Sequence, residues 1–183
     1  MKFLETLILC AMGLACSITA MADYAPADPA LKADLSAVVS SGEIVPVNGM
    51  TTAGQPDAAA LKVFADSGYA AVIDLRTPGE DRGFDEQATV ESLGMNYVNF
   101  PIAGATGISY DNAAKLKLLM DAADGPVLLH CGSANRVGAL LALQKSSEGE
   151  DDEAAMAFGR EAGMTSLDKI VESVIEERPT KTH

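Results

Sequence analysis

The chain has 183 residues, of which 48 % are hydrophobic, and its formal net charge at pH 7 is −13. This length and apolar content suit one domain with a buried core and exclude a disordered chain. Binding to nucleic acid or to an anionic membrane surface needs clustered lysine and arginine, so the acidic composition argues against both. With only two His and three Cys residues, the sequence also predicts neither a metal site nor a cofactor.

A secretory signal peptide is predicted over residues 1–22. Lys2 supplies a positive charge at the start, and the apolar run over 7–16 is shorter than a membrane span. The segment ends in Ala20-Met21-Ala22, the small-residue pattern that precedes a cleavage site. Cleavage would give a periplasmic or secreted protein with no membrane attachment.

Cleavage also changes what the cysteines can do. Cys10 and Cys16 lie within the predicted signal peptide, so the mature chain keeps Cys131 alone. A single thiol cannot form an intramolecular disulfide, and in an oxidising compartment it must be buried or used. In the mature chain we interpret residues 23–42 as a polar N-terminal lead-in with a short helix, and residues 43–183 as the functional domain.

Strands and helices are expected to alternate along the rest of the chain. Apolar runs bounded by turn residues predict the strands, and segments with capping residues predict the helices. The expected strands span residues 44–52 (or a hairpin there), 69–75, 96–102 and 127–130. The expected helices span residues 58–66, 111–123, 137–144, 152–162 and 167–177. This order predicts an α/β fold with a largely parallel central sheet flanked by helices.

The segment from His130 to Arg136 carries the clearest chemical pattern. A buried strand is predicted to end at Cys131, and a helix is predicted to begin near Arg136. Small residues between them let backbone N–H groups converge on one point, where the start of the helix also attracts anions. Arg136 and these donors favour the thiolate of Cys131, the nucleophilic form. The predicted anion-binding loop consists of Gly132, Ser133, Ala134 and Asn135.

Three other side chains are candidates for supporting roles. His130 is expected to order the loop by hydrogen bonding, with a general-base role as the alternative. Arg76 follows a strand at the edge where such sheets bind ligands, so it is a candidate substrate contact, although an ion pair with Asp74 would also explain it. Asp111 is a candidate general acid, although its place at a helix start is also typical of capping.

The pattern of a His-Cys pair, a small-residue loop and an arginine entering a helix resembles the active-site loop of cysteine-based phosphatases and rhodaneses. With that loop, the blocks Thr52–Pro56, Val72–Arg76 and Phe100–Ile102 resemble the beta-lactamase-hydrolase-like, phosphatase-like domain family. The similarity covers residues 44 to 175. It implies a fold like that of dual-specificity phosphatases, and it makes residues 43–183 a phosphatase-like or sulfurtransferase-like catalytic domain.

The loop departs from the tyrosine phosphatase pattern. Four residues, rather than five, separate Cys131 from Arg136, which resembles the rhodanese loop. Val137 stands where phosphatases have Ser or Thr, and the segment Ala103–Ala105 has no acidic residue where the dual-specificity pattern has an Asp. A general acid contributes about 10²–10⁴-fold to such hydrolysis, so its loss favours sulfur transfer, in which sulfite leaves as an anion.

The sequence therefore predicts a cofactor-free enzyme that transfers sulfur through a Cys131 persulfide, with thiosulfate or a persulfide as its small anionic substrate. Two alternatives stay open. One is a phosphatase that hydrolyses phosphate esters through a cysteinyl-phosphate. The other is a non-catalytic module that binds a small anion or a protein. The sequence identifies no protein partner and no oligomeric state.

Overall fold

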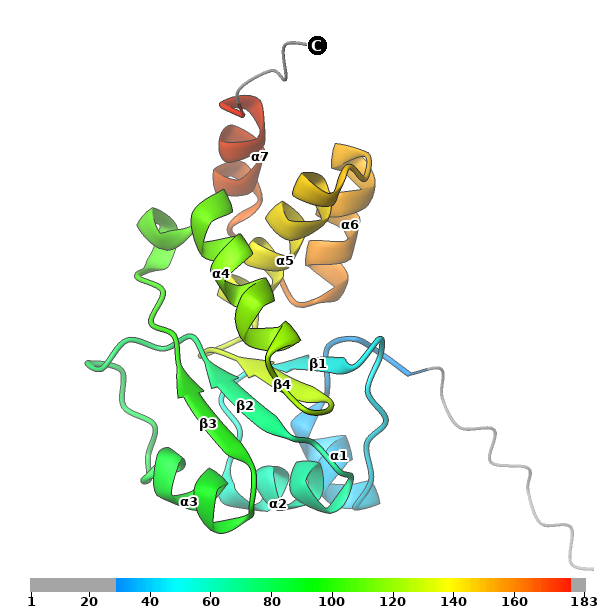
Figure 1. Ribbon diagram of the computed structural model, residues 1–183, viewed down its shortest axis with the longest axis vertical. Helices are drawn as coiled ribbons and strands as arrows, with labels where there is room; N and C mark the ends of the chain where they lie inside the picture. The colour runs from blue at the N-terminus through cyan, green and yellow to red at the C-terminus, as the bar shows by residue number, and fades with distance from the viewer. Residues whose placement is uncertain (1–28, 179–183) are drawn as a thin grey trace, which may run out of the picture.

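Figure 1 presents a computed structural model of the chain, which describes residues 29–178. At its centre lies a sheet of four parallel strands in the order β1-β4-β2-β3. The strands are β1 (Met50–Ala53), β2 (Ala71–Asp74), β3 (Asn96–Asn99) and β4 (Val127–His130). The predicted parallel α/β sheet is thus confirmed. The predicted signal peptide, residues 1–22, lies outside the described residues.

Helices cover both faces of the sheet (Figure 1). One face carries α1 (Leu35–Ser41), α2 (Ala58–Asp66) and α3 (Glu86–Ser92). The other face carries α4 (Tyr110–Asp121), α5 (Asn135–Glu148), α6 (Asp152–Glu161) and α7 (Asp168–Glu176), with a 3₁₀ turn, η1 (Gly104–Gly107), before α4. Alternate residues of a strand point to opposite faces, so Leu128 packs in one core and Leu129 in the other. Both central strands, β2 and β4, are buried throughout.

The described part of the N-terminal lead-in, residues 29–42, is packed into this domain. The N–H of Ala33 donates a hydrogen bond to the carbonyl oxygen of Thr52 at 2.8 Å. The N–H of Thr52 in turn donates to the carbonyl oxygen of Leu31 at 2.8 Å. These bonds extend the sheet beyond β1 and bury Leu31 in the core. The lead-in helix is α1, which begins after the capping residue Asp34.

The first half of the expected strand over 44–52 is a hairpin turn. Val47 and Met50 exchange backbone hydrogen bonds of 2.9 and 3.0 Å across Asn48 and Gly49. These two residues have φ values of 51° and 77°, the conformation that a tight two-residue hairpin turn requires and that Asn-Gly adopts most easily. The regular strand therefore begins only at Met50.

The sequence did not predict α3. Asp85 caps it by accepting a hydrogen bond from the N–H of Ala88 at 3.0 Å. Val90 is its single buried apolar residue, so no apolar stripe of helical period marks the segment. The helices predicted from residue 58 onward lie within four residues of their expected bounds, and α2 spans residues 58–66 as predicted, whereas α1 begins six residues after the start expected at Pro29. Over residues 29–178, no helix has both the length and the hydrophobicity to cross a membrane.

The start of α5 is fixed by its close crossing with α6. A Cβ atom on Gly138 would lie 2.3 Å from the carbonyl oxygen of Gly159 and 2.5 Å from the backbone nitrogen of Met164. The two helix backbones therefore meet with no side chain between them at this point. Because α5 follows the Cys131 loop directly, this crossing also holds the helix end into which the loop leads.

Candidate active site

Cys131 follows β4 directly, at the carboxyl end of a central strand. Because β4 pairs with both β1 and β2, the loop starts in the middle of the edge where ligands bind in open parallel sheets. The residue is 1 % exposed and packs in the core that faces α4 and α5. Within the described part of the chain it is the free cysteine.

The loop after Cys131 curls into the start of α5. Ala134 has a left-handed φ of 67°, and no side chain caps the helix. The first N–H groups of an α-helix have no acceptor within the helix, so those of α5 are available to a ligand. On the other side, Gln55 donates its N–H to the carbonyl oxygen of Gly132 at 3.4 Å. A Cβ atom on Gly54 would lie 3.3 Å from that oxygen, so a small residue there lets the two segments meet.

Arg136 lies beside Cys131 and is held by a bidentate ion pair. Its Nη1 and Nη2 donate to Oε1 and Oε2 of Glu80 at 2.7 and 2.6 Å, and Nη1 also donates to the carbonyl oxygen of Ile102 at 3.0 Å. Among the described residues, no oxygen accepts a hydrogen bond from Nε or from the second hydrogen of Nη2, so this edge of the guanidinium is available to the Cys131 side chain and to an oxyanion. The hydrogen bond to Glu80 raises the pKa of Arg136, and Cys131 raises it further.

Glu80 is a site residue that the sequence analysis did not single out. It follows β2 in the turn at the ligand-binding edge, and this position was the only indication of a role. Its carboxylate also accepts hydrogen bonds from the N–H and the hydroxyl of Thr77 at 2.8 and 3.1 Å. The hydrogen bonds from Arg136 lower the pKa of Glu80 to about 2, so the carboxylate is ionised at neutral pH and cannot serve as a general acid there.

The Glu80→Gln variant should lose stability that the wild type holds above pH 4.5. The pKa of Glu80 falls from 4.5 to about 2 on folding, so its contribution is present above the unfolded value and disappears as the pH falls through the folded value. Thermal unfolding measured from pH 7 to pH 2 should show the wild type losing its advantage over the variant between these two values. Glu91→Gln, at an exposed position, is the control and should follow the wild type. Parallel curves for wild type and Glu80→Gln would contradict the expectation.

The predicted ion pair between Asp74 and Arg76 is wrong. Asp74 turns toward α3, where its Oδ2 accepts a hydrogen bond from Nε of Arg82 at 2.7 Å. Arg76 contacts Asp74 only through its backbone N–H, at 2.7 Å from Oδ1. Its side chain, beyond the end of the strand, donates to the side-chain oxygen of Gln55 and to the carbonyl oxygen of Asp81. Arg76 therefore joins the two segments that flank the loop, and a direct substrate contact stays a prediction.

The remaining predicted site residues fall in different places. His130 is fully buried on the face opposite Cys131, where its Nε2 lies 3.1 Å from Oε1 of Glu86. Asn135 turns its side-chain oxygen to the N–H groups of Thr165 and Ser166 at 2.8 and 3.1 Å, so this amide ties the loop to the connection before α7. The structure thus gives Asn135 a backbone position in the loop and its side chain a structural contact.

Asp111 is exposed in the first turn of α4. The helix is capped instead by Ser109, whose hydroxyl accepts a hydrogen bond from the N–H of Asn112 at 3.3 Å. We find no hydrogen bond between Asp111 and the Cys131 loop in the described residues. Its position suits the positive end of the helix dipole, and a general-acid role stays a prediction.

One buried group of side chains has metal-ligating atoms close together. Ligand atoms of Asp74, Glu86 and His130 lie within 4.8 Å of one another. However, Asp74 Oδ2 already accepts hydrogen bonds from Arg82 and from the hydroxyl of Tyr97, the latter at 2.8 Å. A divalent cation would have to displace the guanidinium that neutralises this carboxylate. Arg82 therefore neutralises Asp74, and we assign no metal ion to this group.

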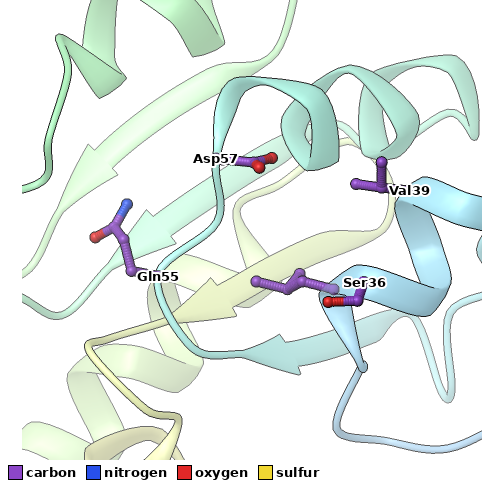
Figure 2. Close-up of a pocket in the computed structure, with 5 residues that line it drawn as sticks. Ser36, Val39, Gln55 and Asp57 are labelled. Atoms are coloured by element: carbon purple, nitrogen blue, oxygen red, sulfur yellow. The ribbon is translucent and has the colours of Figure 1, made fainter.

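A cavity of about 370 Å³ opens between α1 and the segment that leads into α2. Figure 2 shows Ser36 and Val39 of α1 on one side of it and Gln55 and Asp57, before α2, on the other. Gln55 belongs to both the cavity and the loop contact described above. The cavity lies on the face of α1 and α2, whereas the Cys131 side chain packs in the core on the other face, so Gln55 is what the cavity and the loop share.

The fold and the site together define a class: an α/β domain with a loop that runs from a candidate cysteine nucleophile to an arginine at the start of a helix. Residues 45–148 match the family described as beta-lactamase hydrolase-like protein, phosphatase-like domain. The chain belongs to this family, as its sequence motifs predicted.

Two curated relatives carry the same description. A beta-lactamase hydrolase-like protein from Agrobacterium fabrum is 31 % identical over 104 residues, which cover 55 % of this chain and 24 % of the relative. One from Xylella fastidiosa (strain Temecula1) is 33 % identical over 112 residues, which cover 58 % of this chain and 26 % of the relative. The chain therefore spans about a quarter of the length of the curated relatives it matches.

Solved structures of phosphatases have a similar fold. TpbA from P. aeruginosa, in a complex with phosphotyrosine, has a TM-score of 0.55 at 18 % identity, and the alignment covers 70 % of this chain and 78 % of that one. Kinase-associated phosphatase has a TM-score of 0.55 at 14 % identity, with 70 % and 84 % covered. These similarities confirm the predicted fold, which is that of dual-specificity phosphatases.

Proposed function

We propose that the domain is a phosphatase that hydrolyses phosphate monoesters through a cysteinyl-phosphate on Cys131. The observation that carries the proposal is the free guanidinium edge of Arg136 beside Cys131, at the start of an uncapped helix. The family and the phosphatase neighbours, one of them with bound phosphotyrosine, support this alternative better than sulfur transfer. We therefore take it as the first candidate.

The reaction has two steps. In the first, the Cys131 thiolate attacks phosphorus, so that an S–P bond forms while the P–O bond to the alcohol breaks, and the alcohol takes a proton from water. The N–H groups at the start of α5 and the Nε and Nη2 of Arg136 stabilise the charge on the phosphoryl oxygens. In the second step, water attacks phosphorus, the S–P bond breaks, and inorganic phosphate leaves.

The proposed substrates are esters with a good leaving group. The segment Ala103–Ala105 has no acidic residue where the dual-specificity pattern has an Asp, and Glu80 is ionised with a pKa of about 2. An alkyl leaving group needs a proton donor in the transition state, whereas a phenol leaves as an anion more easily. Aryl phosphates should therefore react faster than alkyl phosphates. If the predicted signal peptide is cleaved, this activity lies in the periplasm or outside the cell.

Sulfur transfer is the second candidate. Its support is the spacing of four residues between Cys131 and Arg136, with Val137 after the arginine. In that reaction the Cys131 thiolate attacks the outer sulfur of thiosulfate, the S–S bond breaks, and sulfite leaves as the persulfide forms. No leaving group has to be protonated.

A side-by-side assay of the protein starting at residue 23 separates the two candidates. With 4-nitrophenyl phosphate we expect steady turnover, and with thiosulfate plus cyanide we expect no thiocyanate. Intact-mass measurement after thiosulfate treatment should show no added sulfur on Cys131. Thiocyanate formation without phosphate release would reverse the choice, and the absence of both reactions would favour the non-catalytic binding module.

A further inference from the structure

Glu86 and His130 form a buried polar pair that the proposed reaction does not use. Glu86 is 1 % exposed and His130 is 0 % exposed. Neither side chain has a hydrogen-bond partner of good geometry among the described residues, although Oε1 of Glu86 lies 3.1 Å from Nε2 of His130. Burial of a carboxylate costs free energy unless it is paired, so the burial of Glu86 next to His130 needs a reason beyond packing.

The other polar groups nearby already have partners. Asp74 receives hydrogen bonds from the N–H of Arg76 at 2.7 Å and from Nε of Arg82 at 2.7 Å. Its Oδ1 lies 3.7 Å from Nε2 of His130, and Nε of Arg82 forms an ion pair with Oε2 of Glu86 at 3.6 Å, both longer than a hydrogen bond. Of these contacts, only the 3.1 Å approach of Glu86 to His130 is short enough for a hydrogen bond.

One peptide bond joins this pair to the candidate nucleophile. His130 is the last residue of β4, where it lies between Ala53 of β1 and Asp74 of β2. Its carbonyl oxygen accepts a hydrogen bond from the N–H of Leu75 at 2.9 Å. The sheet therefore holds the backbone of His130, while the side chain of His130 lies against the first turn of α3.

We propose that Glu86 is a positioning residue for Cys131. Through His130 it holds the end of β4 from the face opposite the loop, and so sets the direction in which the loop leaves the sheet. The effect on turnover rests on the proposed phosphatase function, whereas the effect on the loop does not. Glu86 is the first residue of α3, so the helix that the sequence did not reveal brings this carboxylate to the site.

Glu86→Leu and Glu86→Gln test the proposal, with Glu91→Leu and Glu91→Gln as matched controls on the exposed side of the same helix. The amide of glutamine keeps an acceptor oxygen for His130, and leucine does not. We expect kcat for 4-nitrophenyl phosphate to fall about 10- to 100-fold in Glu86→Leu and about threefold in Glu86→Gln, with KM changed less than kcat. Amide hydrogen exchange should accelerate at residues 131–134 and not at the α5–α6 crossing.

The exchange measurement separates this inference from the proposed function. If wild type hydrolyses no ester but Glu86→Leu still loosens residues 131–134 selectively, the proposed function fails and the positioning role stands. If both Glu86 variants keep kcat and local exchange while only the melting temperature falls, the residue is merely structural and the inference is overturned. If Glu86→Leu does not fold, Glu86→Gln is compared with Glu91→Gln by kcat and by amide exchange at residues 131–134. Equal values for these two variants would overturn the inference.

Discussion

Replacing Cys131 with serine should abolish hydrolysis of 4-nitrophenyl phosphate, with kcat at least about 10⁴-fold below the wild-type value. The hydroxyl of serine occupies nearly the same volume, but it is a far weaker nucleophile than the thiolate. Because Cys131 is buried at the end of a central strand, the substitution leaves the loop backbone and Arg136 in place. Phosphate release measured against the wild type checks the expectation.

Binding of an inert anion provides the control for this variant. Tungstate affinity, measured by calorimetry, should stay within about threefold of wild type, because the donors are backbone N–H groups and Arg136. Turnover that survives in Cys131→Ser would eliminate the cysteinyl-phosphate. Loss of tungstate binding together with turnover would mean that the variant disturbs the loop, and Cys131→Ala would then be needed to assign the nucleophile.

Replacing Arg136 with lysine should lower kcat/KM by about 10²–10³-fold, as removal of a preorganised donor to a transition-state oxygen typically does. Lysine keeps a positive charge, but it cannot bind Glu80 with one edge and an oxyanion with the other. The lost bidentate geometry leaves Glu80 with Thr77 and with Nε of Arg76 at 3.5 Å, so its negative charge is less well neutralised beside the substrate. Steady-state kinetics with 4-nitrophenyl phosphate measures the change.

Arg160→Lys is the matched control, because Arg160 is exposed and pairs with Asp168 on the surface. Its kcat/KM should equal that of wild type. The double variant Glu80→Gln/Arg136→Lys should recover part of the loss, since the less well neutralised carboxylate is absent. Equal kinetics for Arg136→Lys and wild type would show that charge alone suffices and would refute the bidentate role.

The active-site loop could be placed from sequence because its information is local. The apolar run before His130, the small residues after Cys131 and the arginine at the helix start are contiguous. The loop spacing, Val137 after the arginine and the absence of an acidic residue over residues 103–105 nevertheless led to sulfur transfer as the first prediction. The family match and the phosphatase neighbours support the phosphatase alternative better, since fold similarity extends over the whole domain whereas spacing concerns four residues.

The supporting residues could not be placed in the same way. Glu80 lies 56 positions before the arginine that it clamps, and Glu86 lies 44 positions before His130. The pairing of Asp74 was predicted with Arg76, its neighbour on the strand, but the chain turns after β2 and brings Arg82 to that carboxylate. Sequence spacing predicts contacts within an element and not across a loop that returns to it.

The sequence by itself determined the parallel α/β class, the position of Cys131 after a buried strand and the small-residue loop ahead of a helix. Each of these depends on periodicity and on residue types next to one another along the chain. The tertiary structure decided the contacts between distant residues: Arg136 with Glu80, Arg82 with Asp74, and Glu86 with His130. Strand order β1-β4-β2-β3 brings these distant segments to one edge of the sheet, and buried charges must then pair with whichever group that order supplies.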